Sequence, residues 1–200
     1  MKQEIQNKFE SNINRVKSLV NIYKSAIGNG AKGRRGHEHT DILRAAVVLL
    51  HATTEDILRS LAYWRLPSAG SQVLSNFALP NSSGANKFTL GDLSAHRGST
   101  VEDVIKKSVD AYLEKSNYNN NKEVSGLLTN IGLNVSMVNH TFSLLEKMML
   151  RRHQIVHRAD RNSDAVGRGN HKIRTIGHRE VDQWINNVET FGKSIFNQLP

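Results

Sequence analysis

Proline is scarce in this chain of 200 residues, and apolar residues follow a helical spacing over long stretches. The three prolines are Pro67, Pro80 and Pro200, so residues 1–66 and 81–199 contain none. Proline inside a helix removes a hydrogen bond and clashes with the preceding turn, so its absence permits long helices. In residues 5–27 apolar side chains recur at three- and four-residue steps, which is one face of an α-helix.

The same periodicity predicts a second long helix and several later ones. The second begins at Thr40 or Asp41, ends before Pro67 and is apolar nearly all round in its first half, which is typical of a central helix. Later helices are predicted after a capping box of Ser99 and Glu102, within 123–133, and from Asn139 or Thr141 to about His157. The last helix is predicted to begin at His178 or Arg179. Its apolar stripe consists of Val181, Trp184, Ile185, Val188, Phe191 and Ile195.

Turn-forming residues gather in residues 66–99, which therefore reads as an irregular insertion. Within it, residues 88–93 are compatible with a short strand or a single helical turn. The sequence predicts an all-α fold, a helical bundle of five to six helices with this insertion. We expect one domain over residues 1–200.

Charge and cysteine content limit the function classes. Lys and Arg total 27 against 18 Asp and Glu, a net charge of +9 that suggests a polyanionic partner, with plain solubility as the alternative explanation. The chain has no cysteine, which excludes disulfides and thiol chemistry. Residues 1–17 carry no signal-like apolar run and no segment is apolar enough to span a membrane, so we expect a cytoplasmic protein without a membrane partner.

The motifs typical of cofactor or metal sites are weak. Gly28, Gly30 and Gly33 match a dinucleotide-binding pattern, but they follow a predicted helix instead of a strand, so we expect no cofactor. His153 and His157 lie four residues apart and would share a helix face, with Asp160 or His171 as a possible third metal ligand. The surrounding arginines disfavour a dication, so we expect no metal.

The strongest basic segment lies between Leu150 and Arg179. It contains eight Lys and Arg and two Asp, a local excess of +6 within the net charge of +9. One or two of these cations would suffice to complement a helix C-terminus. Arginine binds a phosphate through two parallel hydrogen bonds, and histidine exchanges protons near neutral pH. An Arg and His cluster therefore suits phosphodiester chemistry.

Arg152 and His157, with four residues between them, resemble the R-x(4–6)-H signature of the HEPN superfamily. His153 occupies the polar position that often follows the arginine. The segments LLHATTEDILRSL and LRRHQIVHRADRN, followed by the Trp-bearing last helix, resemble the RiboL-PSP-HEPN branch over residues 40–196.

The resemblance implies a metal-independent endoribonuclease that works as a homodimer with the motif at the interface. It makes Arg152 and His157 the catalytic pair and His153 their polar support. Glu55 or Asp56 would supply an acid from the second helix, and Arg151 is a substitute for Arg152 at the looser spacing. The cations expected to bind RNA are Arg158, Arg161, Arg168, Lys172 and Arg174.

Two points stay open in the sequence. Arg152 and His157 are five residues apart, hence about 140° apart on an ideal helix, so they share a face only if the helix loosens or a partner subunit completes the site. The alternative function is a non-catalytic HEPN module that binds RNA or a protein partner. The resemblance also suggests a toxin or antiphage defence effector with an antitoxin or defence partner, although Ala159 replaces the Tyr of toxins that are inactivated by AMP transfer.

Overall fold

The computed structural model describes residues 1–27, 37–80, 89–161 and 173–200, with the side chains of His37 and Glu38 excepted. All regular secondary structure in the described residues is helical. Outside the helices there is one isolated β-bridge, between Arg161 and Ile173, and the described residues form no strand. The predicted all-α class is confirmed. The helices are α1 (Lys2–Ile27), α2 (His37–Arg65), α3 (Ser71–Leu74), α4 (Leu90–Ser94), α5 (Val101–Lys115), α6 (Asn121–Asn130), α7 (Phe142–Arg158) and α8 (His178–Phe196), with 3₁₀ turns η1 (Leu66–Ser68), η2 (Val135–Met137) and η3 (Asn139–Thr141).

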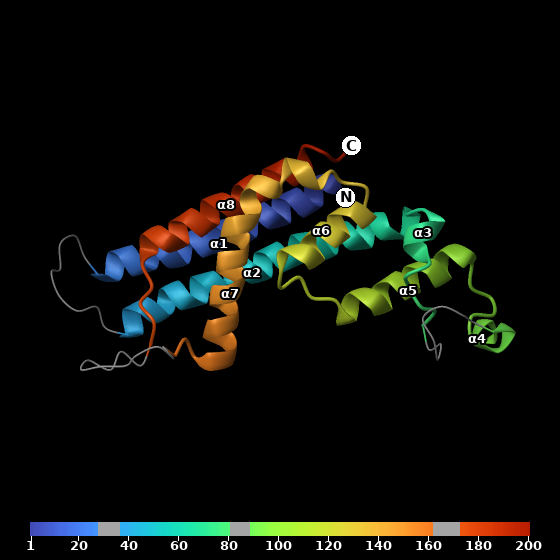
Figure 1. Ribbon diagram of the computed structural model, residues 1–200, viewed down its shortest axis with the longest axis horizontal. Coiled ribbons are helices and arrows are strands. Elements are labelled where there is room, and N and C mark those ends of the chain that lie inside the picture. Colours follow the sequence, from blue (N-terminus) through green and yellow to red (C-terminus); the bar gives the residue numbers. More distant parts are fainter. Residues whose placement is uncertain (28–36, 81–88, 162–172) are drawn as a thin grey trace.

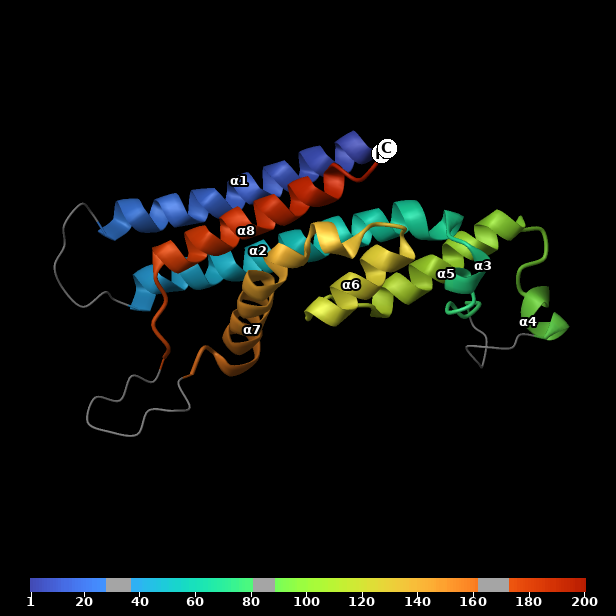
Figure 2. The ribbon, with the colours of Figure 1, turned by 45° about the horizontal axis from the view of Figure 1, so that its top comes forward.

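Helix α2 is the centre of the bundle, as its sequence predicted. Leu43, Leu50 and Leu58 on α2 are fully buried. Helices α1 and α8 lie along α2, α7 crosses it steeply, and α5 and α6 lie beside its second half (Figure 1, Figure 2). The chain ends meet, because the Lys2 ammonium donates to the Leu199 carbonyl at 2.7 Å.

The last helix confirms its predicted apolar stripe. It begins at His178, and Val181, Trp184, Ile185, Val188, Phe191 and Ile195 are all buried. Gly192 on α8 lets α1 approach closely, since a Cβ there would lie 2.5 Å from the Phe9 ring. No helix in the described ranges is both long and apolar enough to cross a bilayer.

Several predicted boundaries are wrong by a few residues. Helix α2 begins at His37, and Thr40 and Asp41 accept hydrogen bonds from Arg44 at 2.7 and 3.1 Å. The capping box before α5 pairs Thr100 with Asp103, one residue later than Ser99 and Glu102. In both cases several neighbouring polar residues could cap the helix, and the side-chain geometry determines which of them does so.

The region predicted as an irregular insertion contains η1 and two short helices in its described part. Residues 88–93 fall partly within α4, so the helical alternative is right for Leu90–Ser94 and the strand is not. These short helices raise the helix count above the predicted five to six. The insertion lies at the α5 end of the bundle (Figure 1).

Candidate functional site

A buried carboxylate anchors the end of α7. Asp160 is fully buried, and its Oδ2 accepts hydrogen bonds from Arg44 Nε at 2.7 Å and from Arg151 Nη2 at 2.8 Å. Arg44 belongs to α2 and Arg151 to α7, so one carboxylate joins two helices. The other oxygen, Oδ1, has no hydrogen-bond partner among the described residues.

The chain leaves α7 through a tight reversal around Asp160. Ala159 and Asp160 adopt positive φ angles of 47° and 55°. Both of their N–H groups donate to the Gln154 carbonyl, and Arg174 N donates to the Asp160 carbonyl at 2.9 Å. Immediately after Asp160, Arg161 forms an isolated antiparallel β-bridge with Ile173. These contacts hold the segment after Lys172 against the end of α7.

The two adjacent arginines of the motif have different environments. Arg151 is 9% exposed and donates to Asp160 and to the carbonyls of Arg174 and Thr175 at 3.3 and 3.0 Å. Burial lowers the pKa of its guanidinium, and Asp160 opposes that shift. The structure thus places Arg151 inside the protein, where it stabilises the fold, and not at the surface as a substitute for Arg152.

Arg152 is half-buried and faces α2. Its Nε is sealed from solvent, and its guanidinium makes no hydrogen bond or ion pair with any residue that the structure describes. His51 of α2 lies near enough for the charge of Arg152 to lower its pKa. Glu55, one of the expected acids, is one turn further along α2, with Oε2 3.6 Å from His51 Nδ1. The site therefore brings Arg152, His51 and Glu55 together.

Sequence reasoning missed His51. It is 1% exposed, and neither ring nitrogen has a hydrogen-bond partner in the described part of the chain. Burial is the main cause that lowers its pKa, Glu55 raises it, and Arg152 lowers it further. The signal in the sequence was a lone polar residue at a core position of the most apolar helix, four residues before an acid.

We expect His51 to make folding pH-dependent. Its pKa in the folded protein lies below the ordinary 6.5, so in the window between these values the unfolded chain binds more protons and stability rises with pH. The His51→Leu variant should lose this dependence below pH 6.5. At pH 7 it should be more stable by about 1 kcal/mol, because two unpartnered buried nitrogens are removed. Urea unfolding at several pH values measures both, and His153→Leu at an exposed site is the control. An unaltered pH dependence in His51→Leu would contradict the assignment.

The candidate catalytic histidines are exposed. His153 and His157 lie one turn apart on α7, with ring centroids 4.5 Å apart. Neither makes a hydrogen bond or ion pair with another described residue, so both imidazoles are accessible. Helix α7 stays regular through Arg158, so the predicted end near His157 is right within one residue. The possible loosening between Arg152 and His157 is absent, and the angle of about 140° between them remains.

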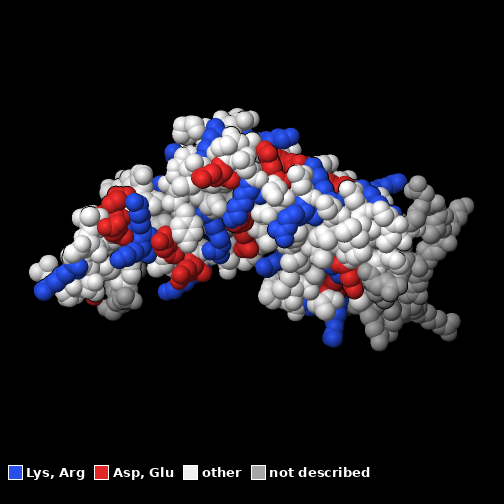
Figure 3. All heavy atoms as spheres, turned by 180° about the vertical axis from the view of Figure 1, so that it is seen from behind, with Lys and Arg blue, Asp and Glu red and all other residues white. Residues whose placement is uncertain are grey.

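The structure describes three of the five cations that are expected to bind RNA. Arg158, Arg161 and Arg174 are exposed, and Arg174 Nη1 donates to Gln154 Oε1 at 2.8 Å. Arg168 and Lys172 lie outside the described residues. On the face shown in Figure 3, acidic and basic side chains alternate without forming a single basic patch. The exposed basic side chains that the structure places near the motif are therefore Arg158 at the end of α7, Arg161 and Arg174.

The second acid proposed from α2 has other partners. Asp56 accepts from Lys8 Nζ at 2.7 Å and from Asn12 Nδ2 at 3.5 Å, both on α1. The structure therefore brings Glu55, and not Asp56, beside His51. The alternative third metal ligand Asp160 is held by two arginines, and His171 is outside the described residues. Within the described ranges, no group of three His, Asp or Glu could hold a metal ion.

The all-helical fold is consistent with a HEPN-like domain. A sequence profile of the RiboL-PSP-HEPN family matches residues 10–200, and the chain belongs to this family. HEPN domains as a class are associated with RNA, ribonuclease activity included. No curated protein and no solved structure shows a significant match to the chain.

Proposed function

We propose that the protein is a metal-independent endoribonuclease. The observation that carries the proposal is the contrast on α7 between Arg151, whose Nη2 donates to Asp160 and to two backbone carbonyls, and Arg152, whose half-buried guanidinium is unpaired among the described residues. An arginine without a partner and an accessible imidazole, that of His157 on the same helix, are the two groups that recognition and cleavage of a phosphodiester need. Membership of the HEPN class supports RNA as the substrate.

Cleavage proceeds through the 2′-OH next to the scissile phosphate. The 2′ oxygen forms a bond to phosphorus, the bond to the 5′ oxygen breaks, and the products are a 2′,3′-cyclic phosphate and a 5′-OH. The attacking 2′-OH loses a proton and the leaving 5′ oxygen gains one; His157 transfers one of these protons and solvent water exchanges the other, while Arg152 stabilises the charge that develops on the phosphorane. His153, whose ring centroid lies 4.5 Å from that of His157, supports that imidazole. Glu55 supplies a negative charge on α2 near His51 and Arg152.

A homodimer completes the site in this proposal. Arg152 faces α2 while His157 is exposed, so a second subunit can supply the missing partner across a two-fold interface. Leu150, which is 59% exposed, lies on the same face of α7 as His153 and His157 and supplies apolar contact area. Arg158, Arg161, Arg168, Lys172 and Arg174 would hold the RNA backbone near this interface.

A second candidate function is a non-catalytic module that binds RNA or a protein partner. The separation of Arg152 and His157 around α7 favours it, because one subunit alone does not bring them together. A role as a toxin or antiphage defence effector in the cytoplasm, controlled by an antitoxin or defence partner, rests on the family resemblance and stays a prediction.

Incubation of the purified protein with total RNA in EDTA separates the two candidates. We expect cleavage to fragments with cyclic phosphate ends, and no cleavage of single-stranded DNA of the same sequence, since DNA lacks the 2′-OH. Binding of RNA without cleavage would support the module instead. Activity that EDTA abolishes would contradict both and point to a metal held by His153 and His157.

A further inference from the structure

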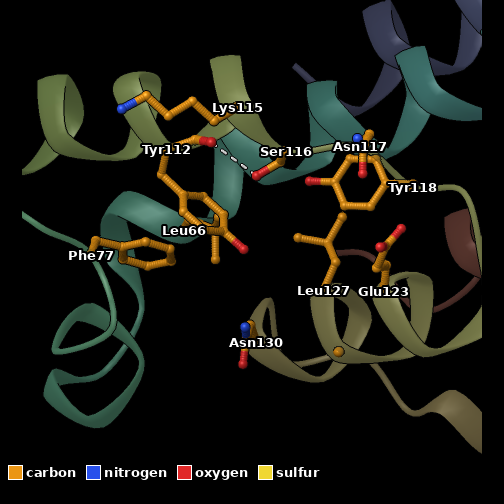
Figure 4. A pocket seen from close by; sticks show the side chains of 11 residues that line it. Leu66, Phe77, Tyr112, Lys115, Ser116, Asn117, Tyr118, Glu123, Leu127 and Asn130 are labelled. Carbon is orange, nitrogen blue, oxygen red and sulfur yellow. Dashed lines mark hydrogen bonds between the residues drawn. The ribbon is translucent and has the colours of Figure 1, made fainter. Parts of the chain in front are cut away.

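A pocket remote from the α7 motif lies between α5, α6 and η1. Its volume is about 390 Å³, within the range of small-ligand sites. Leu66 and Leu127 form apolar walls, and Phe77 and Tyr112 form an aromatic side (Figure 4). The Phe77 and Tyr112 ring centroids are 4.6 Å apart with an interplanar angle of 65°. Tyr112 is 43% exposed, so its ring is open to a ligand.

The pocket contains a buried hydroxyl without a partner. Tyr118 is 4% exposed, and its hydroxyl has no hydrogen-bond partner among the described residues. Figure 4 shows this hydroxyl directed toward the space between α5 and α6, with Asn130 on the far side. Burial raises the pKa of Tyr118 to about 12, so the hydroxyl stays protonated and can donate a hydrogen bond.

The wall that carries Tyr118 is held firmly by α2. Arg59 donates to the carbonyls of Leu113 and Ser116, and its guanidinium lies 6.0 Å from the centre of the Tyr118 ring. Glu55 Oε1 accepts from the Tyr118 backbone N–H at 3.5 Å. The unpartnered hydroxyl is therefore fixed in place before any ligand arrives, which is how specific sites reduce the cost of binding.

We propose that this pocket binds a nucleobase, either of a free nucleotide or of an unpaired base in RNA. The base would lie against Tyr112 and Phe77, accept a hydrogen bond from Tyr118, and pair with the amide of Asn130, which both donates and accepts. A purely apolar ligand would leave the Tyr118 hydroxyl unpartnered.

The charges at the rim agree with a nucleotide. Lys115 lines the pocket and can face the phosphate. The acid in the lining, Glu123, accepts a hydrogen bond from Asn119 N at 2.7 Å and lies on the other side of the pocket from Lys115 (Figure 4). Binding here goes beyond the proposed ribonuclease activity, because it requires no cleavage.

A substitution at Gly126 of α6 can obstruct the pocket. Gly126 lines the pocket, and a Cβ added there would have no neighbour within 4 Å. Gly126 is also exposed, so a leucine at this position adds its side chain at the pocket from outside the core. Thr129 is exposed on the same helix and does not line the pocket, so Thr129→Leu is the matched control. Tyr118→Phe removes the hydroxyl alone.

The test is titration calorimetry of the full chain carrying His157→Ala, which keeps RNA intact. The probes are AMP, GMP, CMP and UMP, and a short single-stranded RNA. We expect at least one probe to bind, with Gly126→Leu weakening it by about tenfold or more, Tyr118→Phe by several-fold, and Thr129→Leu not at all. Saturation by a mononucleotide identifies a free nucleotide as the ligand, and binding of RNA alone identifies a base within a strand.

The proposal is overturned if no probe binds at millimolar concentration, if Gly126→Leu binds as tightly as its parent, or if Thr129→Leu loses as much affinity. These outcomes are separable from a failure of the ribonuclease proposal. RNA cleavage in EDTA without nucleobase binding would overturn the pocket alone. Binding that depends on Gly126, in a protein that never cleaves RNA, would overturn the ribonuclease alone.

Discussion

Replacement of His157 by alanine is expected to reduce RNA cleavage in EDTA by about 10²–10⁴-fold, the usual contribution of a general acid or base. The fold should be unaffected, because His157 is exposed near the end of α7 and makes no hydrogen bond or ion pair within the described residues. Initial rates on a fluorescent RNA, with circular dichroism for the fold, measure both.

His140→Ala is the matched control, since His140 is also an exposed histidine but precedes α7. It should cleave RNA at the parent rate. Arg152→Ala should lower the rate like His157→Ala, and Arg152→Lys should recover only part of it, because lysine keeps the charge but not the planar fork. Parent-level cleavage by His157→Ala would show that the motif is not the catalytic site.

Replacement of Asp160 by alanine is expected to lower the free energy of unfolding by about 3–5 kcal/mol. The carboxylate is fully buried and accepts from Arg44 and Arg151, so its removal leaves the Arg151 guanidinium without its paired carboxylate and Arg44 with only the exposed Asp41 as its counter-charge. It also removes the link between α2 and the end of α7. Urea unfolding at pH 7 gives the loss directly.

Asp182→Ala is the control for this loss. Asp182 pairs with Lys24 at 3.0 Å, but both side chains are well exposed, and such pairs contribute less than about 1 kcal/mol. An Asp160→Ala protein as stable as Asp182→Ala would mean that the buried network does not hold α7. Loss of cleavage by Asp160→Ala is expected as well, as a consequence of lost structure.

The helices themselves were predictable because their information is local. Helix α8 shows this most clearly, since Val181, Trp184 and Val188 follow the helical period and are all buried. The central position of α2 was also predictable, because a helix that is apolar nearly all round must be covered on every side. The family resemblance in turn rested on the Arg152 and His157 motif together with the α2 segment before it and the Trp-bearing helix after it, in their order along the chain.

The helix boundaries were less predictable because neighbouring polar residues compete for the same backbone groups. Thr40 and Asp41 looked like caps in the sequence, yet both accept hydrogen bonds from Arg44, which also donates to Asp160 at the end of α7. That competition involves a residue more than a hundred positions away, so no local pattern could reveal it.

Local sequence patterns were enough to predict an all-helical bundle with a basic Arg and His motif on one late helix. The contacts that each member of this motif makes depend on the tertiary packing. Arg151 and Arg152 are adjacent and chemically identical, but one step of 100° around α7 points the first at buried Asp160 and the second at His51. The packing of α2, α7 and the segment after residue 172 determines which of the two arginines pairs with a carboxylate. These segments are far apart in the sequence, so no local pattern reveals the outcome.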